Sequence, residues 1–478
     1  MKTKLFLTAI LIAALSGTSI KAKAQAVDVN DSLTLVDLYN STGGPSWYNN
    51  TNWLNGPVST WYGVTVTGTR VTQLNLSTNN LTGPIPASIG KLTEIGYLVL
   101  SYNNINDTIP ASIGNITKLV SLQLFNNQLS EKIPSSVSNL LHLELLYLHN
   151  NQLSGSIPAS IGTMPSLHFL NLSHNRLTGT IPSSIYNLTN LNYLIVDHNH
   201  LKGTISPAIG NLTQLTFLHL DNNQFSGNIP YTIGNLVNIF ELGLSHNHLT
   251  GTIPTSFSNF NSLVNLDLSN NMLSENTNIT FARHKPKLNA DISNNRFTFN
   301  GLEVIAQNIP KAKYAPQALV AIHQQGNTLS VSAGGTLSNN TYYWFKAGET
   351  GSTSSIAGDS TFHPTQNGLY YAQITNSIAA KLMLMTDTVN YMAAMTNQPI
   401  NTISVYPNPA KGALTIQGLN EKRNNKITIA DISGSVWLNA TVNMQATAKY
   451  NISRLKPGNY IVYVNDGTET RAVQFIKK

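Results

Sequence analysis

An asparagine recurs every 24 residues through the middle of this 478-residue chain. The ten positions are Asn79, Asn103, Asn127, Asn151, Asn175, Asn199, Asn223, Asn247, Asn271 and Asn295. Each lies in a similar frame of leucine, isoleucine, glycine and proline. Units this short cannot bury their own apolar residues, so ten in succession predict a solenoid in which each unit packs on the next.

The repeated frame predicts which side chains face inward. Leucines at alternate positions, as at Leu74 and Leu76, describe a short strand with one buried face, and later residues such as Ile85 must turn inward from the rest of the coil. The recurring asparagine carries two donors and an acceptor, which suit loop backbone groups that no strand ladder reaches. We therefore interpret the ten asparagines as a structural ladder.

The frame resembles the plant-type leucine-rich repeat. After the asparagine comes a Gly-x-Ile-Pro segment and then Ile-Gly-Asn-Leu, which residues 226–236 match closely. The resemblance implies an α/β solenoid of about ten 24-residue repeats, which we place at residues 71–313. The last two copies lack the Gly-x-Ile-Pro half, which fits a terminal cap.

The first 24 residues have the pattern of an export signal. Lys2 and Lys4 precede a largely apolar run over residues 5–15, and Ala22-Lys23-Ala24 offers a cleavage site between small residues. The run is too short to span a bilayer, and no later stretch is long enough. We therefore expect a signal peptide at residues 1–24 and no transmembrane segment after its removal.

Residues 25–70 are expected to cover the first repeat. Asp31 is placed to cap a short helix. Three tryptophans add apolar mass, at Trp47, Trp53 and Trp61. Residues 58–66 are similar to the N-terminal cap of plant-type repeats, in which cysteines would stand at Val58 and Val66. The chain has no cysteine, so apolar packing is expected to replace that disulfide.

The net charge of +7 is unevenly placed. Residues 25–300 carry 10 basic and 13 acidic side chains, a difference of minus 3. A nucleic-acid groove needs a basic stripe that displaces counterions. The mild acidity of the repeat region therefore argues against a nucleic-acid partner.

The repeats stop before residues 314–391, where alternating segments such as residues 341–345 are bounded by Gly, Ser, Asn and Pro. This part looks like an immunoglobulin-type β-sandwich with Trp344 as its core anchor. We expect it to act as a spacer, followed by a linker at residues 392–401.

Residues 402–478 carry four motifs in a fixed order. The first contains Pro407, Asn408 and Pro409, the third contains Gly458, and the chain ends in Phe-Ile-Lys-Lys. The succession resembles the type A C-terminal sorting domain of the type IX (Por) secretion system of Bacteroidetes-type Gram-negative bacteria. The resemblance implies a second small β-sandwich, the type IX machinery as a partner, and a secreted or outer-surface location.

The inner strand face of a solenoid is its usual contact surface. Two columns on this face are rich in rings and are expected to form one surface with Phe125 and His149 beside them, because neighbouring strands lie about 4.8 Å apart. Its candidate ligand-binding residues are Tyr97, Phe125, Tyr147, His149, Phe169, Tyr193, Phe217 and His219. Such a surface can bind a partner or can stabilise the sheet as cross-strand pairs, and the sequence leaves both readings open.

Histidine and aspartate also recur at loop positions. His174, His198 and His246 share one column, and Asp197 and Asp221 share the next. The sequence has no tight ligand spacing, so we expect neither a metal site nor a cofactor. Without a cysteine, a GxSxG motif or an HExxH motif, we expect no catalytic residues.

These inferences converge on a non-enzymatic binding or adhesion protein, secreted or on the cell surface. We expect it to dock an extracellular protein or a glycan on the concave face, with aromatic rings stacking on the ligand. An inhibitor of polysaccharide-degrading enzymes is an alternative, and a carbohydrate-active enzyme is a less favoured one. Release and surface anchoring both remain open.

Overall fold

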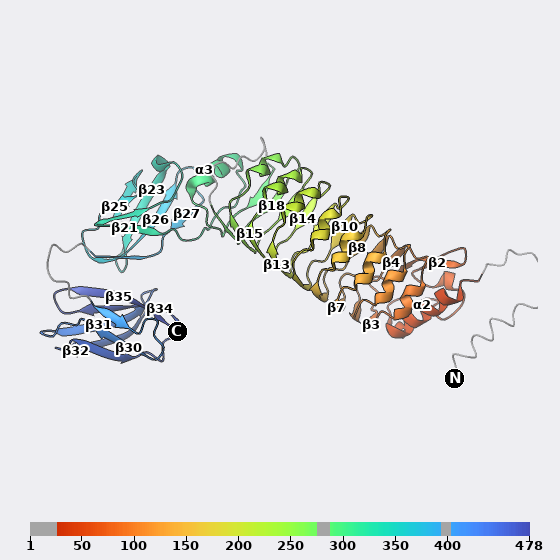
Figure 1. Ribbon diagram of the computed structural model, residues 1–478, viewed down its shortest axis with the longest axis horizontal. Helices are drawn as coiled ribbons and strands as arrows, with labels where there is room; N and C mark the ends of the chain where they lie inside the picture. Colours follow the sequence, from red (N-terminus) through yellow and green to blue (C-terminus); the bar gives the residue numbers. More distant parts are fainter. Residues whose placement is uncertain (1–25, 275–286, 393–402) are drawn as a thin grey trace, which may run out of the picture.

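The computed structural model describes residues 26–274, 287–392 and 403–478. The expected signal peptide lies outside the described residues, as does nearly all of the expected linker. Successive coils of the repeat region stack side by side into a long solenoid (Figure 1). The predicted α/β solenoid followed by small all-β sheets is confirmed.

The inner face of the solenoid is an 11-stranded sheet in which β1 is antiparallel to β2 and every later strand is parallel to its neighbour. Its strands are β1 (Val64–Thr67), β2 (Arg70–Asn75), β4 (Tyr97–Val99), β6 (Ser121–Gln123), β8 (Leu145–Tyr147), β10 (Phe169–Asn171), β12 (Tyr193–Ile195), β14 (Phe217–His219), β16 (Glu241–Gly243), β18 (Asn265–Asp267) and β20 (Asn289–Asp291). Equivalent positions pair throughout, as Leu74 with Leu98 and Leu98 with Leu122. Side chains one repeat apart therefore lie next to each other.

A second parallel sheet of nine strands lines another side of the coils. Its strands are β3 (Thr82–Pro84), β5 (Asn104–Asp107), β7 (Gln128–Lys132), β9 (Gln152–Ser156), β11 (Arg176–Gly179), β13 (His200–Thr204), β15 (Gln224–Asn228), β17 (His248–Gly251) and β19 (Met272–Leu273). The coil then closes through a short helical turn.

The helical turns are 3-10 rather than α. They are η3 (Ala87–Lys91), η4 (Ala111–Asn115), η5 (Ser135–Asn139), η6 (Ala159–Thr163), η7 (Ser183–Asn187), η8 (Pro207–Asn211), η9 (Tyr231–Asn235) and η10 (Thr255–Asn259). A proline such as Pro86 precedes most of them, because its fixed φ suits the extended residue before a helix. The isoleucine two residues into the turn, such as Ile89, is fully buried.

One hydrophobic core runs the length of the solenoid. Leu74, Leu98 and Leu122 from successive strands are all 0% exposed. Burying one leucine stabilises the fold by roughly 1.5–3 kcal/mol relative to leaving it in water. Because each coil covers its neighbours, the ends of the array need covers of their own.

The N-terminal cover contains α2 (Val29–Ser41), η1 (Gly44–Ser46) and η2 (Val58–Thr60). The expectation that Asp31 caps this helix is wrong. Asp28 is the cap, since its Oδ1 accepts from the backbone N–H of Asn30 at 2.8 Å. Asp31 is instead buried, where its carboxylate binds the Arg70 guanidinium at 2.9 Å.

The three tryptophans of the cover pack together as expected. Trp47 and Trp53 lie with ring centroids 4.8 Å apart, and Trp53 and Trp61 are also 4.8 Å apart. All three are buried in the solenoid core. Aromatic packing thus closes this end of the cysteine-free chain.

At the other end of the solenoid, Gln317 takes the place of the next ladder asparagine. Its Oε1 accepts from the backbone N–H of Asn295 at 3.1 Å, and its Nε2 donates to the carbonyl of Ile292 at 3.0 Å. The helix α3 (Phe299–Asn308) lies between these segments in sequence and adds buried apolar residues such as Leu302. The ladder therefore continues one step beyond its last asparagine.

Two antiparallel sheets follow α3. The first joins β21 (Ile322–Gln325), β22 (Thr328–Val331) and β25 (Thr361–Phe362), and the second joins β23 (Asn340–Lys346), β24 (Ser354–Ala357), β26 (Gly368–Asn376), β27 (Met383–Met385) and β28 (Val389–Tyr391). Trp344 is 0% exposed and stacks on Phe362 of the other sheet, with ring centroids 5.2 Å apart. The alternating pattern therefore identified the core residue of these sheets.

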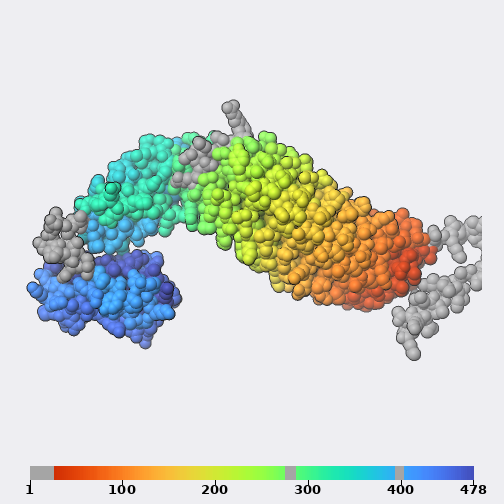
Figure 2. Space-filling view, in the orientation of Figure 1, coloured from red at the N-terminus to blue at the C-terminus, as the bar shows by residue number. Residues whose placement is uncertain are grey.

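These sheets share their core with the solenoid. Figure 2 shows them lying directly against its C-terminal end. The Glu303 carboxylate on α3 accepts from Asn376 at 2.7 Å and from the backbone N–H of Thr336 at 3.0 Å. The middle sheets thus pack against the end of the solenoid and cover it. Their expected role as a spacer stays a prediction.

The last part of the chain has a separate core. One sheet joins β29 (Ser404–Tyr406), β30 (Ala413–Gln417) and β33 (Thr447–Asn451), and the other joins β31 (Asn424–Asp431), β32 (Val436–Asn443), β34 (Gly458–Asn465) and β35 (Thr470–Lys477). Phe475 and Val462 from the second sheet pack with Leu414 and Ile416 from the first. Two sheets around one core make a small β-sandwich.

Candidate functional site

The ring-bearing residues lie on the inner sheet, where strand pairing sets their spacing. Phe169 pairs with Tyr193 and Tyr193 pairs with Phe217 in consecutive parallel strands. The next residue of each strand, such as Leu194, is buried in the core. Because successive strand residues point to opposite faces, the rings point away from the core.

Three rings of this column stack face to face. The centroids of Phe169 and Tyr193 are 4.4 Å apart at an interplanar angle of 26°, and those of Tyr193 and Phe217 are 4.5 Å apart at 10°. The ring of Tyr193 is therefore covered on both faces, by Phe169 on one side and by Phe217 on the other. The faces of Tyr193 are thus not free for contact, and its ring edge is. The expected stacking of ring faces on a ligand stays a prediction for the other rings.

A second group of rings extends the surface toward the N-terminal repeats. Phe125 stacks on His149 at 4.4 Å, and Tyr147 lies 6.2 Å from Phe125 and 6.4 Å from Phe169. Tyr147 thus connects the two groups. We call the connected rings of Phe125, Tyr147, His149, Phe169, Tyr193 and Phe217 the ring column.

The sequence pattern did not reveal two ring contacts, and one predicted residue stands apart. Phe240 lies beside Phe217 with ring centroids 5.8 Å apart. Tyr102 packs edge-on against Phe125 with centroids 5.1 Å apart, from a turn position where most repeats carry asparagine or histidine. Tyr97 is 45% exposed and makes no ring contact within the described part of the chain. Ser121 and Leu145 separate Tyr97 from Phe169 along their shared column, which explains its isolation.

His149 is the one candidate histidine with a clear electrostatic perturbation. Burial lowers its pKa from 6.5 to about 4, and the nearby His174 adds to this effect. Its Nδ1 is buried and has no hydrogen-bond partner. The imidazole is therefore neutral at pH 7 and contributes as an aromatic ring.

Beyond Phe217 the surface becomes polar and forms an open pocket of about 450 Å³. Its carboxylates come from Asp197, Asp221, Glu241, Asp267 and Asp291, and its basic groups come from His198, His219 and Lys313. His219 ends the strand that carries Phe217, and its Nε2 lies 3.4 Å from the Glu241 carboxylate. The ring column thus leads directly into a predominantly acidic pocket.

Gly243 makes room for one of these carboxylates. A Cβ atom at this position would lie 2.0 Å from Oδ2 of Asp221. Burial raises the pKa of the Asp221 carboxyl, while hydrogen bonds from Ser245 act in the opposite direction. Those bonds run from the Ser245 backbone N–H at 2.8 Å and from its hydroxyl at 2.9 Å to Oδ1 of Asp221.

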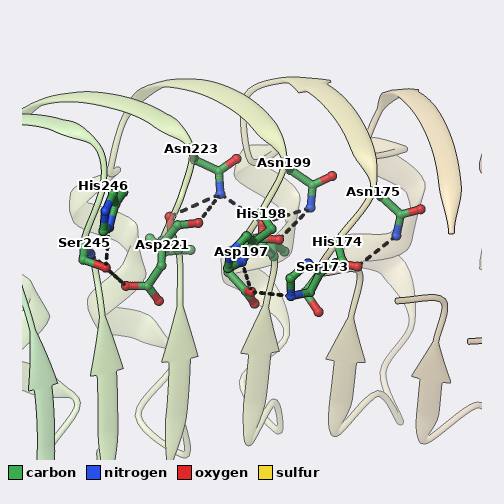
Figure 3. Close-up of polar contacts among 12 residues, drawn as sticks. Ser173, His174, Asn175, Asp197, His198, Asn199, Asp221, Asn223, Ser245 and His246 are labelled. Carbon is green, nitrogen blue, oxygen red and sulfur yellow. Dashed lines mark hydrogen bonds and ion pairs between the residues drawn. The ribbon is translucent and has the colours of Figure 1, made fainter. Parts of the chain in front are cut away.

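The ladder asparagines hold the turns that follow the inner strands (Figure 3). Asn199 is representative: its Nδ2 donates to the carbonyls of Leu172 and Asp197, and its Oδ1 accepts from the backbone N–H of Leu177 at 2.9 Å. The same donation to the preceding coil is made by Asn103, Asn127, Asn151, Asn175, Asn223, Asn247, Asn271 and Asn295. Asn79 instead donates to Asn49 in the N-terminal cover.

Three of the loop residues from the histidine and aspartate columns come together. Oδ2 of Asp197 approaches both imidazoles, at 2.8 Å from Nδ1 of His198 and 3.8 Å from Nε2 of His174 (Figure 3). His246 shares the histidine column, but its Nδ1 lies 3.4 Å from the hydroxyl of Ser245. His174 belongs to the coil before that of Asp197 and His198, so its proximity to them follows from stacking and no short motif reveals it.

The predicted sorting motif fixes one edge of the C-terminal sandwich. Asn408 accepts from the backbone N–H of Ile476 at 2.9 Å and donates to the carbonyl of Gln474 at 3.2 Å. It stands between Pro407 and Pro409, and both prolines follow cis peptide bonds. Gly458 begins the central strand β34. The motif thus ties the start of this part of the chain to its last strand.

None of the helices among the described residues has both the length and the apolar composition needed to cross a bilayer.

Histidine, cysteine and carboxylate groups that could hold a metal ion gather at one place in the described ranges, the cluster of His174, Asp197 and His198. A leucine-rich solenoid typically serves as a binding scaffold.

Several solved structures share the solenoid fold. The Arabidopsis receptor kinase HAESA, solved with the peptide hormone IDA and the co-receptor SERK1, is 31% identical with a TM-score of 0.51, covering 57% of this chain and 46% of that one. The plant peptide hormone receptor RGFR1, solved with RGF2, is 38% identical with a TM-score of 0.49, covering 52% and 40%. A plant ice-binding protein is 24% identical with a TM-score of 0.50, covering 62% and 100%. This chain therefore spans less than half the length of either receptor chain.

Family models match the repeat region and the C-terminal part of the chain. Leucine rich repeat models match residues 69–129, 142–164, 170–225 and 238–260. The secretion system C-terminal sorting domain matches residues 404–478 and indicates export by the type IX system. No curated protein matches the sequence. The chain therefore contains leucine-rich repeats and, at residues 404–478, a secretion system C-terminal sorting domain.

Proposed function

We propose that this protein is a non-enzymatic extracellular binding protein whose concave sheet docks a polypeptide segment of a partner. The observation that supports this most is the continuous ring column over β8–β14, which leads into the acidic pocket. A partly exposed apolar strip beside a polar pocket is the composition of a contact site.

The orientation of the rings favours a polypeptide over a glycan. A sugar stacks on an exposed ring face, but Tyr193 has a neighbouring ring on each face. Ring edges carry partial positive charge and suit backbone carbonyl oxygens and apolar side chains. A glycan bound mainly through hydroxyl groups to the acidic pocket is the second candidate.

The acidic pocket supports a ligand with a basic side chain at one end. Five carboxylates face Lys313 and two histidines there, and Lys313 lies 3.6 Å from the Asp291 carboxylate. Complementary charge at such a position sets orientation and register more than total affinity. The HAESA structure, which holds a peptide hormone on the same type of solenoid, is consistent with a polypeptide ligand.

The sorting domain supports a location outside the cell. We propose that the type IX machinery exports the protein to the medium or the outer surface of a Bacteroidetes-type Gram-negative bacterium. We also propose the division into a signal peptide (1–24), cap (25–70), solenoid (71–313), immunoglobulin-like sandwich (314–391), linker (392–401) and sorting domain (402–478).

Binding to two arrays, one of polypeptides and one of glycans, tests which class of ligand the protein binds. The purified protein is applied to an array of secreted proteins and extracellular peptides and to an array of glycans. The proposal predicts reproducible binders on the first array, with preference for peptides that contain lysine or arginine. Binding confined to glycans would support the second candidate, and no binder on either array would contradict both.

Enzyme assays separate the remaining alternatives. An inhibitor of polysaccharide-degrading enzymes would itself be a protein-binding protein, so it would slow hydrolysis by such enzymes when added to them. A carbohydrate-active enzyme would release products from a glycan panel without any added enzyme. The proposal predicts no hydrolysis by the protein alone.

A further inference from the structure

Two imidazoles and one carboxylate converge at the edge of the concave face. His174, Asp197 and His198 each offer one ligand atom, and these atoms all lie within 4.8 Å of one another. The two imidazole rings are stacked with centroids 4.0 Å apart and an interplanar angle of 16°. We propose that this cluster binds a divalent transition-metal ion of the zinc type.

The backbone holds the three residues in place. His174 and His198 occupy left-handed turn positions, with φ of 51° and 50°. The His174 backbone N–H donates to the Asp197 carbonyl at 3.0 Å, and Nδ2 of Asn199 donates to the same carbonyl at 3.1 Å. The ligands therefore stand on rigid, hydrogen-bonded turns, which lowers the cost of ordering them around an ion.

The donor set and its spacing suit zinc better than calcium. Imidazole nitrogens favour zinc, copper and nickel, whereas calcium takes oxygen ligands. Zinc bonds of about 2.0–2.2 Å place tetrahedral ligand atoms roughly 3.3–3.6 Å apart. The observed 2.8 Å and 3.8 Å separations from Asp197 bracket this range. The two stacked imidazole rings must turn apart for both nitrogens to face one ion.

The exposure of the three side chains fits a metal site with one open coordination position. The Asp197 side chain is only 12% exposed, while those of His174 and His198 are 48% and 45% exposed. A nearly buried carboxylate beside two accessible imidazoles leaves room for water or a partner's side chain as the fourth ligand.

Backbone conformation alone does not account for the cluster. Left-handed positions favour asparagine and histidine, and asparagine occupies this column at Asn126, Asn150, Asn222, Asn270 and Asn294. That preference explains a histidine in the column but not an aspartate between two of them. His246 has the same backbone conformation with a serine in the aspartate position, which makes it a matched control.

Calorimetric titration of the untagged, full-length protein with ZnCl₂ tests the proposal. One zinc ion per chain is expected, CaCl₂ should give no binding, and Co²⁺ should give the visible absorption of a site with nitrogen and oxygen ligands. His174→Asn or His198→Asn should weaken zinc binding by at least about ten-fold, and His246→Asn should leave it unchanged.

Asparagine is tolerated in this column, so the variants are expected to fold, and circular dichroism with thermal unfolding verifies it. Absence of zinc binding in the wild-type protein would overturn the proposal. So would equal zinc affinity in the wild-type protein and a folded H174N/H198N double variant, because binding would then come from other histidines.

Discussion

The Nδ2 amide of Asn199 donates a hydrogen bond of 3.0 Å to the carbonyl of Leu172, which lies 27 residues earlier in the preceding coil. The same side chain accepts from the backbone N–H of Leu177. Each ladder asparagine of this kind joins two coils at a place where strand pairing has ended. The ladder is thus a second set of links between coils, in addition to the sheets.

Asn199→Ala should lower the free energy of unfolding by roughly 2–4 kcal/mol, because it leaves several buried backbone groups without partners. Urea denaturation followed by circular dichroism measures the change. His200→Ala, at the next and exposed position, is the control and should shift stability by less than about 0.5 kcal/mol. Equal effects of the two substitutions would contradict a structural role for the ladder.

Gly243→Ala should destabilise the protein by about 1–3 kcal/mol, because the added Cβ would lie 2.0 Å from the Asp221 carboxylate. The double variant G243A/D221A should recover much of that loss, since the obstructing carboxylate is gone. A double-mutant cycle in urea measures the coupling. Strict additivity of the two changes would show that the contact is not the cause.

The lowered pKa of His149 predicts that the stability of the protein depends on pH. Its pKa is about 4 in the folded protein and 6.5 when unperturbed, so the unfolded chain binds more protons between these values. Stability should therefore fall as the pH is lowered from 6.5 to 4. Allowing for solvent screening, we expect a contribution of roughly 1 kcal/mol.

His149→Phe is the variant that isolates this contribution. Phenylalanine already occupies the equivalent position one repeat earlier, at Phe125, so the change preserves a ring in the column. The variant should lose less stability than the wild-type protein between pH 6.5 and 4. Identical pH profiles would exclude His149 as a source of the pH dependence.

Much of the fold follows from the period of the sequence. A constant 24-residue repeat dictates parallel strands in register, so the columns of Phe169, Tyr193 and Phe217 could be predicted by counting. Trp344 as a core residue followed from the alternating pattern together with the resemblance to an immunoglobulin-type sandwich. These features depend on local spacing, which a single sequence contains.

Other features depend on three-dimensional choices that spacing does not determine. Asp28 caps α2, whereas Asp31 binds Arg70, which lies far along the chain. Sequence spacing does not reveal that pairing. Gln317 continues the ladder from a segment without the repeat pattern. The face-to-face packing of the rings is set by side-chain torsions, and the grouping of His174 with Asp197 by the stacking of coils.

The most direct test of the ring column as a contact surface uses a ligand identified on the arrays. The measurement is the affinity of that ligand for the triple variant Tyr147→Ser, Phe169→Ser and Tyr193→Ser. Cross-strand ring pairs contribute roughly 0.2–1 kcal/mol each, so the variant should remain folded. Tyr97→Ser, which removes an exposed ring on the same face outside the ring column, is the matched control. We expect surface plasmon resonance to find binding abolished in the triple variant and retained in the control. An unchanged dissociation constant in a folded triple variant would contradict this expectation.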